Sequence, residues 1–354
     1  MGGSKQGDRK KIGAGGQKSH PPREPRPAPV ARPTPVTQRA PVARPEGAHI
    51  RLVSDGHAVP FSKGLLATTL TATGLPPERA HAVALDVEWQ LLQGGERDIS
   101  VERLRQMVEL VLAESEGQLY LERYRKWNRL AREDRPVIIL IGGATGVGKS
   151  TIAAQLADRL GVVRIISTDA IREVMRAFFS KSLMPAIHYS SYEADKAVRI
   201  PLGSGLDSHV VGFMEQVEMV NVGVMAVLER AIKERTGLLI EGVHIVPGML
   251  ASAWNPQLME DVLFLPMIVA VRDRELHRSH FLVREQETSG RRAIARYLQG
   301  FEEIRRIQDF ILERAEAEGT LVVDNISIDD TVGTVVDALY DLIEKRERAS
   351  SAAG

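Results

Sequence analysis

The sequence predicts an α/β fold built on a parallel β-sheet that helices cover on both faces. Short apolar runs alternate with segments of helical periodicity over residues 136–346, and the first run leads directly into a glycine-rich loop. Strands buried on both faces of a parallel sheet are continuously apolar, as these runs are. A smaller α+β unit precedes them, and a chain of 354 residues has room for both.

The main domain is expected over residues 136–346, with a short disordered tail over 347–354. Its expected buried strands are Val137–Ile141, Val163–Ile166, Leu238–Ile240, Phe264–Val271 and Thr320–Val323. Between them, Val211–Lys233 repeats apolar residues at helical spacing, which indicates a helix packed in the core rather than a cofactor site.

The neutral net charge of the whole chain hides an uneven distribution. Lys+Arg and Asp+Glu both number 46, but residues 1–48 carry ten basic against three acidic residues. This segment also holds nine of the 18 prolines, so we expect a disordered basic tail. The tail is either a solvated leader or a weak, salt-sensitive binder of RNA, phosphates or anionic lipid. The acidic remainder argues against specific nucleic-acid binding.

Composition also excludes several classes of protein. The chain has no cysteine, which excludes disulfides, thiolate catalysis and cysteine zinc sites. The longest strongly apolar stretch, Val262–Val271, is too short to span a bilayer and contains Pro266. No apolar core of a secretory signal is visible near the N-terminus. A cytoplasmic protein without a membrane partner is expected.

Residues 49–115 are expected to form the small domain, with a β-hairpin followed by helices. Asp55-Gly56 marks a tight turn between strands at Ile50–Val53 and Ala58–Phe61. Helices are expected at Ser62–Thr73, from Pro76-Pro77 to Gly94, and from Ser100 onward. Residues 116–135 are expected to form a helix that links the two domains.

The glycine-rich loop after the first main strand is a phosphate-binding loop. Gly143, Gly148, Lys149 and Ser150 satisfy the pattern G-x-x-x-x-G-K-[ST], with a strand before it and an amphipathic helix after it. The expected nucleotide-binding residues are Gly143, Ala144, Thr145, Gly146, Val147, Gly148, Lys149, Ser150 and Thr151. Their backbone N–H groups can surround phosphates, Lys149 can reach the β/γ-phosphates, and Ser150 can bind Mg²⁺. Lys149 is expected to be exposed and to contribute little to the core.

Polar residues also end two other strands. Glu241 ends an apolar strand, where it can hold Mg²⁺ through water; alternatively it is an ordinary acidic residue at a strand end. Asp169 and Arg172 lie three residues apart at a helix start, so both face one way. We interpret them as a carboxylate that activates the acceptor and a guanidinium that binds its anion. The alternative is that Asp169 only caps the helix.

An arginine-rich segment near the C-terminus is a candidate lid. Nine arginines lie between Arg272 and Arg306, with Ser289-Gly290 between helical flanks. Such a lid could close on transferring phosphates. The alternative is a solvated helical face balanced by Glu275, Glu285, Glu287, Glu302 and Glu303. The segment around His188 either lines an acceptor pocket or packs the loop, and neither His188 nor His244 has the spacing of a metal site.

Three segments resemble the 2-phosphoglycerate kinase family of archaea and their bacterial relatives. They are Ile141–Thr151, Ile166–Arg176 and Ile240–Gly248, and the resemblance covers about 135–345. It implies phosphorylation of 2-phosphoglycerate to 2,3-bisphosphoglycerate by ATP and Mg²⁺, with Arg172 and Arg176 on the acceptor. The rival hypothesis is a nucleotide-dependent switch without metabolite kinase activity. The oligomeric state is left open.

The small domain resembles an ATP-cone, the regulatory nucleotide-binding module also found in ribonucleotide reductases. Asp55-Gly56 and Pro60–Lys63 match its hairpin and first helix. Cones that bind ATP typically carry basic residues just before the Asp-Gly, where this chain has Val53-Ser54, while Lys63 is kept.

Overall fold

The structure is a computed structural model, and it describes residues 50–54, 57–130, 135–199, 206–250, 261–288 and 291–353. The expected basic tail and the Asp55-Gly56 and Ser289-Gly290 turns lie outside the described residues. So do the side chains of Arg284, Arg291 and Arg292, and these expectations stay predictions.

The main sheet has five parallel strands in the order β5-β6-β4-β7-β8. They are β4 (Val137–Gly142), β5 (Ile165–Ser167), β6 (Leu238–Glu241), β7 (Leu263–Ala270) and β8 (Leu321–Asp324). The predicted parallel sheet is thus confirmed. Val163 lies outside β5 and is 95% exposed, so this apolar residue does not belong to the strand.

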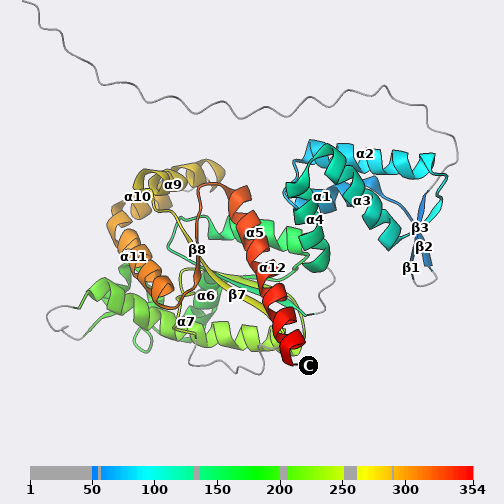
Figure 1. The fold of residues 1–354 in the computed structure, drawn as a ribbon. Helices are drawn as coiled ribbons and strands as arrows, with labels where there is room; N and C mark the ends of the chain where they lie inside the picture. Colours follow the sequence, from blue (N-terminus) through cyan, green and yellow to red (C-terminus); the bar gives the residue numbers. More distant parts are fainter. Residues whose placement is uncertain are drawn as a thin grey trace, which may run out of the picture. The chain divides into compact units, whose positions relative to one another are not determined.

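Helices cover both faces of this sheet (Figure 1). Ile139 and Ile141 of β4 pack in one hydrophobic cluster with α5 (Lys149–Leu160) and α12 (Ile328–Ala353). Ile138 and Leu140, which alternate with them, pack in another cluster with α7 (Ser208–Lys233). Because side chains alternate across a strand, a strand buried on both faces is continuously apolar.

The main domain has six further helices among the described residues. They are α6 (Thr168–Phe178), the 3-10 helices η1 (Ala186–His188) and η2 (Ser191–Ala197), α9 (Arg274–Thr288), α10 (Arg291–Gln299) and α11 (Phe301–Ala317). We expected a disordered tail over 347–354, but α12 continues as a helix to Ala353.

The small N-terminal unit has its own sheet and core. Its elements are β1 (Arg51–Ser54), β2 (His57–Pro60), α1 (Lys63–Ala72), α2 (Pro77–Gln93), β3 (Asp98–Ser100), α3 (Val101–Ser115) and α4 (Gln118–Leu130). β1 pairs with β2 antiparallel and with β3 parallel, and β3 was not predicted. The helix α4 contributes side chains to two hydrophobic cores. Leu121 and Tyr124 pack in the core of the small unit, and Leu130 packs in the core of the main domain. The exact domain boundaries stay a prediction.

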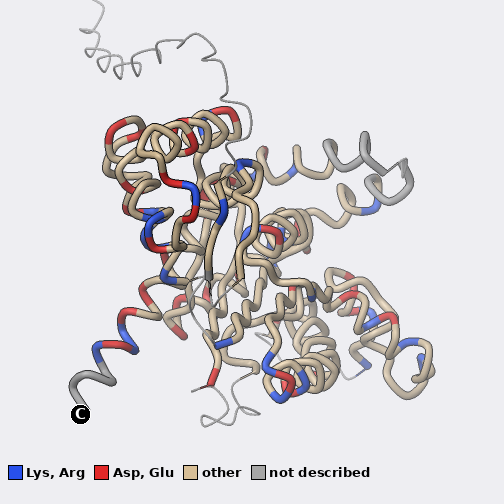
Figure 2. Tube along the Cα trace, turned by 90° about the vertical axis from the view of Figure 1, so that its right-hand side faces the viewer, with Lys and Arg blue, Asp and Glu red and all other residues tan. Residues whose placement is uncertain are grey.

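One described helix, α7, is long and apolar enough to cross a membrane by length and composition. Phe213, Val217, Val220 and Val224 of this helix are buried against the rest of the main domain, as expected for core packing. Figure 2 shows tan strands at the centre, with acidic and basic residues interspersed along the surrounding helices.

Candidate active site

The predicted site residues meet at the carboxyl edge of the main sheet. Strand pairing places Ile141 of β4 opposite Glu241 of β6, and Glu241 opposite Ser167 of β5. The phosphate loop begins directly after β4, and α6 begins directly after β5. The loop, Glu241 and the Asp169/Arg172 helix therefore start from one row of residues, which is where parallel α/β sheets bind ligands.

The phosphate loop needs glycine at its first bend. Gly143 has φ 137°, and a Cβ there would lie 2.1 Å from the carbonyl oxygen of Val269. Any side chain would push the loop away from β7. Gly143 thus keeps the loop against the end of the sheet, so that its N–H groups can face a bound phosphate.

Lys149 and Ser150 begin α5 at the end of this loop. Lys149 is only 8% exposed and its Nζ donates to Ala144 O at 2.7 Å, so our expectation of an exposed lysine was wrong. Its alkyl chain is buried because α5 packs directly on the sheet. The Ser150 hydroxyl donates to Glu241 Oε1 at 3.1 Å. Thr151 is exposed.

Three side chains from the C-terminal half hold the carbonyl groups of the loop. His277 Nε2 lies 2.8 Å from Thr145 O, His280 Nδ1 lies 3.0 Å from Gly146 O, and Asn325 Nδ2 donates to Val147 O at 2.9 Å. Burial lowers the pKa of His277 to about 4, and the nearby Arg305 charge also lowers it. His277 is therefore a neutral donor at physiological pH.

The acceptor side begins with Ser167, which caps α6. Its hydroxyl accepts from the Asp169 N–H at 3.2 Å, so Asp169 is not the cap of this helix. The Asp169 carboxylate is 62% exposed and lies 3.2 Å from a terminal nitrogen of Arg172. Arg172 also donates to Tyr189 O at 2.5 Å. Arg176, one turn later, pairs with Glu173 at 2.6 Å.

Comparisons with known proteins show the family to which the chain belongs. A 2-phosphoglycerate kinase from Methanopyrus kandleri is 39% identical over 86% of this chain and 92% of its own length. One from Methanococcus vannielii is 38% identical over 84% of this chain and 96% of its own. The chain belongs to the 2-phosphoglycerate kinase family. It is a phosphotransferase of the P-loop α/β kinase fold, as the sequence predicted.

Two family models match parts of the chain. The ATP cone domain matches residues 52–133, which confirms the predicted ATP-cone-like unit. The Zeta toxin model matches residues 121–200, which include the phosphate loop and α6. A solved gluconokinase from Sinorhizobium meliloti covers 61% of this chain and 98% of its own length, with a TM-score of 0.32 and 14% identity. That likeness is too distant to bear on function.

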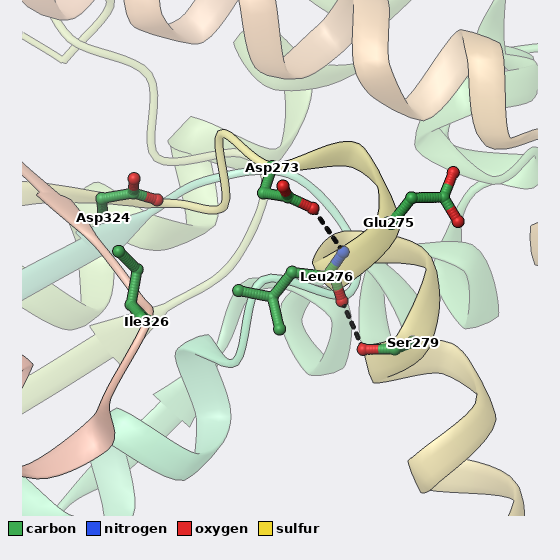
Figure 3. Close-up of a pocket in the computed structure, with 6 residues that line it drawn as sticks. All are labelled: Asp273, Glu275, Leu276, Ser279, Asp324 and Ile326. Atoms are coloured by element: carbon green, nitrogen blue, oxygen red, sulfur yellow. Dashed lines mark hydrogen bonds between the residues drawn. The ribbon is translucent and has the colours of Figure 1, made fainter. Parts of the chain in front are cut away.

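This member of the 2-phosphoglycerate kinase family also has a cavity of about 570 Å³ between the start of α9 and the end of β8. It is lined by Asp273, Glu275, Leu276, Ser279, Asp324 and Ile326 (Figure 3). Asp273 accepts from the Leu276 N–H at 2.7 Å, which fixes the start of α9. The same two segments carry His277 and Asn325, which bind carbonyl groups of the phosphate loop. Sequence periodicity gave no signal for it.

Several arginines of the proposed lid have partners within the protein. Arg305 donates to the carbonyl groups of Val271 at 2.6 Å and Arg272 at 3.1 Å. Arg274 pairs with Glu302.

His188 lies 2.9 Å from Phe179 O, which favours loop packing over pocket lining. Among the described residues, no cluster of three or more His, Asp or Glu could hold a metal.

Proposed function

We propose that this phosphotransferase moves the γ-phosphoryl group of ATP to the free hydroxyl of 2-phosphoglycerate, which yields 2,3-bisphosphoglycerate. The observation that carries the proposal is the shared row of Ile141, Glu241 and Ser167, from which the phosphate loop and the Asp169/Arg172 helix both begin. The relatives from Methanopyrus kandleri and Methanococcus vannielii, which carry the name of this activity, support the choice of acceptor.

The nucleotide is proposed to bind along the loop. Residues 143–151 surround the phosphates with backbone N–H groups at the N-terminus of α5, and Lys149 adds its charge. The cavity bounded by Asp273 and Ile326 then receives the nucleoside, since the segments that form it also bind the loop and present carboxylates that can bind ribose hydroxyls.

The donor set fits a magnesium ion that the nucleotide brings. Ser150 Oγ and Glu241 Oε1 are 3.1 Å apart, and both are oxygen ligands of the kind Mg²⁺ prefers. Ser150 would hold the ion directly and Glu241 would hold it directly or through water. When bound, Mg²⁺ neutralises charge on the phosphates.

The acceptor is proposed to bind over the first turn of α6. Its carboxylate and phosphate groups would compete with Asp169 and Glu173 for the donors of Arg172 and Arg176. Once Arg172 turns to the acceptor anion, the exposed Asp169 carboxylate can accept the proton of the attacking hydroxyl. Such an acceptor is a small cytoplasmic metabolite, so we also propose a cytoplasmic location.

Product detection tests the proposal directly. The purified chain is incubated with ATP, Mg²⁺ and 2-phosphoglycerate, and 2,3-bisphosphoglycerate is measured by ³¹P NMR beside ADP release. We expect ADP release to depend on 2-phosphoglycerate, to be weaker with 3-phosphoglycerate, and to be lost in Asp169→Asn. Glu173→Gln, which changes the neighbouring carboxylate, is the matched control and should keep most of the turnover. ADP release that does not depend on 2-phosphoglycerate would refute the proposed kinase activity.

A further inference from the structure

A hydrogen-bonded chain of three fully buried polar side chains lies behind the acceptor site. Thr168, Gln216 and His244 each have 0% exposure, and they come from the start of α6, from α7 and from the segment after β6. Burying three polar side chains is costly unless each is hydrogen-bonded, and apolar residues could fill the same space. Their partners therefore matter.

The contacts fix the position of the proton on His244. Gln216 Nε2 donates to Ala186 O at 2.6 Å and to Tyr189 O at 3.0 Å, so its Oε1 faces His244 Nε2 at 3.1 Å. An amide oxygen only accepts, so the proton of the imidazole is on Nε2. His244 Nδ1 then accepts from the Thr168 hydroxyl at 2.7 Å. Burial lowers the pKa of His244 to about 3, which keeps it neutral.

Both ends of this chain reach the groups beside Arg172. At one end, Thr168 is the residue before Asp169 and begins α6. At the other end, Tyr189 O accepts from Gln216 and also from Arg172 at 2.5 Å. The backbone at Gly242 (φ 154°), directly after Glu241, lies against the Thr168 hydroxyl, since a Cβ on Gly242 would lie 1.8 Å from Thr168 Oγ1. The chain thus joins the start of α6 to the Tyr189 carbonyl that binds Arg172.

We propose that Thr168 and His244 are positioning residues for the acceptor. By fixing the first turn of α6 and the carbonyl of Tyr189, they hold the backbone that carries Asp169 and Arg172 in the position that phosphoryl transfer requires. The identity of the acceptor in this proposal rests on the function proposed above; the hydrogen-bonded chain itself does not. A misplaced first turn should impair use of the acceptor and leave the nucleotide in place.

The first test compares Thr168→Val, which keeps the shape but removes the hydroxyl, with Thr168→Ser, which keeps the hydroxyl. We expect Thr168→Val to lower kcat/KM for 2-phosphoglycerate by about tenfold or more, with KM for ATP changed less than about threefold. Thr168→Ser should stay within about threefold of the wild type for both substrates. Equal losses for the two substrates, or no loss, would overturn the proposal.

A double-mutant cycle shows whether Thr168 acts through Arg172. If it does, Thr168→Val should lower kcat/KM for 2-phosphoglycerate much less in an Arg172→Lys background than in the wild type. Fully multiplicative losses would mean that Thr168 does not act through Arg172.

The protonation state of His244 can be tested in the wild-type protein, so this test does not depend on whether a variant folds. We expect ¹⁵N NMR to show His244 as the neutral tautomer protonated on Nε2 between pH 6 and 8. A tautomer protonated on Nδ1, or an imidazolium, would contradict the hydrogen-bonded chain. These outcomes are separate from a failure of the proposed function, which would show as a wild-type enzyme that does not phosphorylate 2-phosphoglycerate.

Discussion

The cationic side chains at the carboxyl edge of the main sheet and those of the small N-terminal unit have different hydrogen-bond partners. At the sheet edge, three cations bind backbone carbonyls: Lys149 binds Ala144 O, Arg172 binds Tyr189 O and Arg305 binds Val271 O; of these, Arg172 also lies 3.2 Å from the Asp169 carboxylate. In the small unit, cations bind carboxylates in the pairs Arg51–Asp98, Lys63–Glu88, Arg79–Glu116 and Arg103–Glu96. A carbonyl orients a cation without cancelling its charge, whereas a carboxylate cancels it.

From this difference we expect anionic ligands to bind more strongly at the sheet edge than on the small unit. Lys63, which the ATP-cone resemblance singles out, has its Nζ at 2.6 and 2.8 Å from the two carboxylate oxygens of Glu88. A phosphate on Lys63 would have to displace this carboxylate. The family match shows the cone fold, and the ion pair argues that Lys63 contributes little to anion binding there.

The largest expected effect is at Lys149. Lys149→Ala removes a charge that stabilises the transferring phosphoryl group, so turnover should fall by about a thousandfold or more. Because Lys149 is largely buried, we also expect a modest loss of stability, but no unfolding at assay temperature. Turnover and thermal melting are measured together, with Lys63→Ala as the matched control in the small unit. Near-normal turnover in a folded Lys149→Ala protein would refute the role of the loop.

The second effect tests whether Arg172, which donates to the Tyr189 carbonyl, also binds the anionic acceptor. Arg172→Lys keeps the charge but loses the planar pair of donors, which costs about 1.5–3 kcal/mol, or about ten- to a hundredfold in kcat/KM for 2-phosphoglycerate. The ATP dissociation constant should change less than about threefold. Equal damage to ATP binding would assign Arg172 to the nucleotide site. No change in either would leave Arg172 only its bonds to Asp169 and Tyr189.

The sequence predicted the row at the sheet edge because its parts are local motifs. Gly143–Thr151 follows an apolar strand directly, and Asp169 and Arg172 lie one helical turn apart, so each motif carries its own geometry. The five main strands were found for a similar reason, since apolar runs buried on both faces stand out from their flanks. Ser150 and Glu241 were each assigned to Mg²⁺ from the sequence, and the structure brings them 3.1 Å apart because parallel strands end at one edge.

What the sequence could not predict depends on residues far apart in the chain. Thr168 and His244 are separated by 76 positions, and His277 lies 132 positions from Thr145, so no spacing rule connects them. β3 was missed because its three residues run straight into α3 and leave no room for an alternating pattern. Lys149 was wrongly expected to be exposed because the motif gives its charge but not the packing of its alkyl chain.

A smaller effect concerns the neutral histidines of the sheet edge. The pKa of His277 is about 4 in the folded protein against about 6.5 when unfolded, so the unfolded chain binds a proton more readily between these values. Stability should therefore fall as the pH drops from about 6.5 toward 4, by up to about 1 kcal/mol per pH unit. Above pH 6.5 this contribution is fully present and constant.

Chemical denaturation across this pH range measures the effect. His277→Gln, whose amide can still donate to Thr145 O, should reduce the slope, and His81→Gln in the small unit is the control. An unchanged slope in His277→Gln would mean that other groups cause the acid sensitivity.

The smallest expected effect concerns the Lys63–Glu88 ion pair of the small unit. If Glu88 cancels the charge of Lys63, Lys63→Met should change kcat and KM for ATP by less than about twofold. The pair is about one-quarter exposed, so its loss should cost only about 1 kcal/mol of stability. Lys63→Met/Glu88→Leu should recover part of that cost, because the variant leaves no unpaired carboxylate.

Activity is then measured over a range of ATP concentrations, since a regulatory site on the small unit would show as inhibition or activation beyond saturation of the active site. If the wild type shows such a response and Lys63→Met removes it while Glu88→Gln strengthens it, nucleotide does displace the carboxylate, and both regions bind phosphate. If the response survives Lys63→Met, the small unit binds its effector through other groups. Absence of any response in the wild type would leave anion binding to the sheet edge, as the pairing of charges implies.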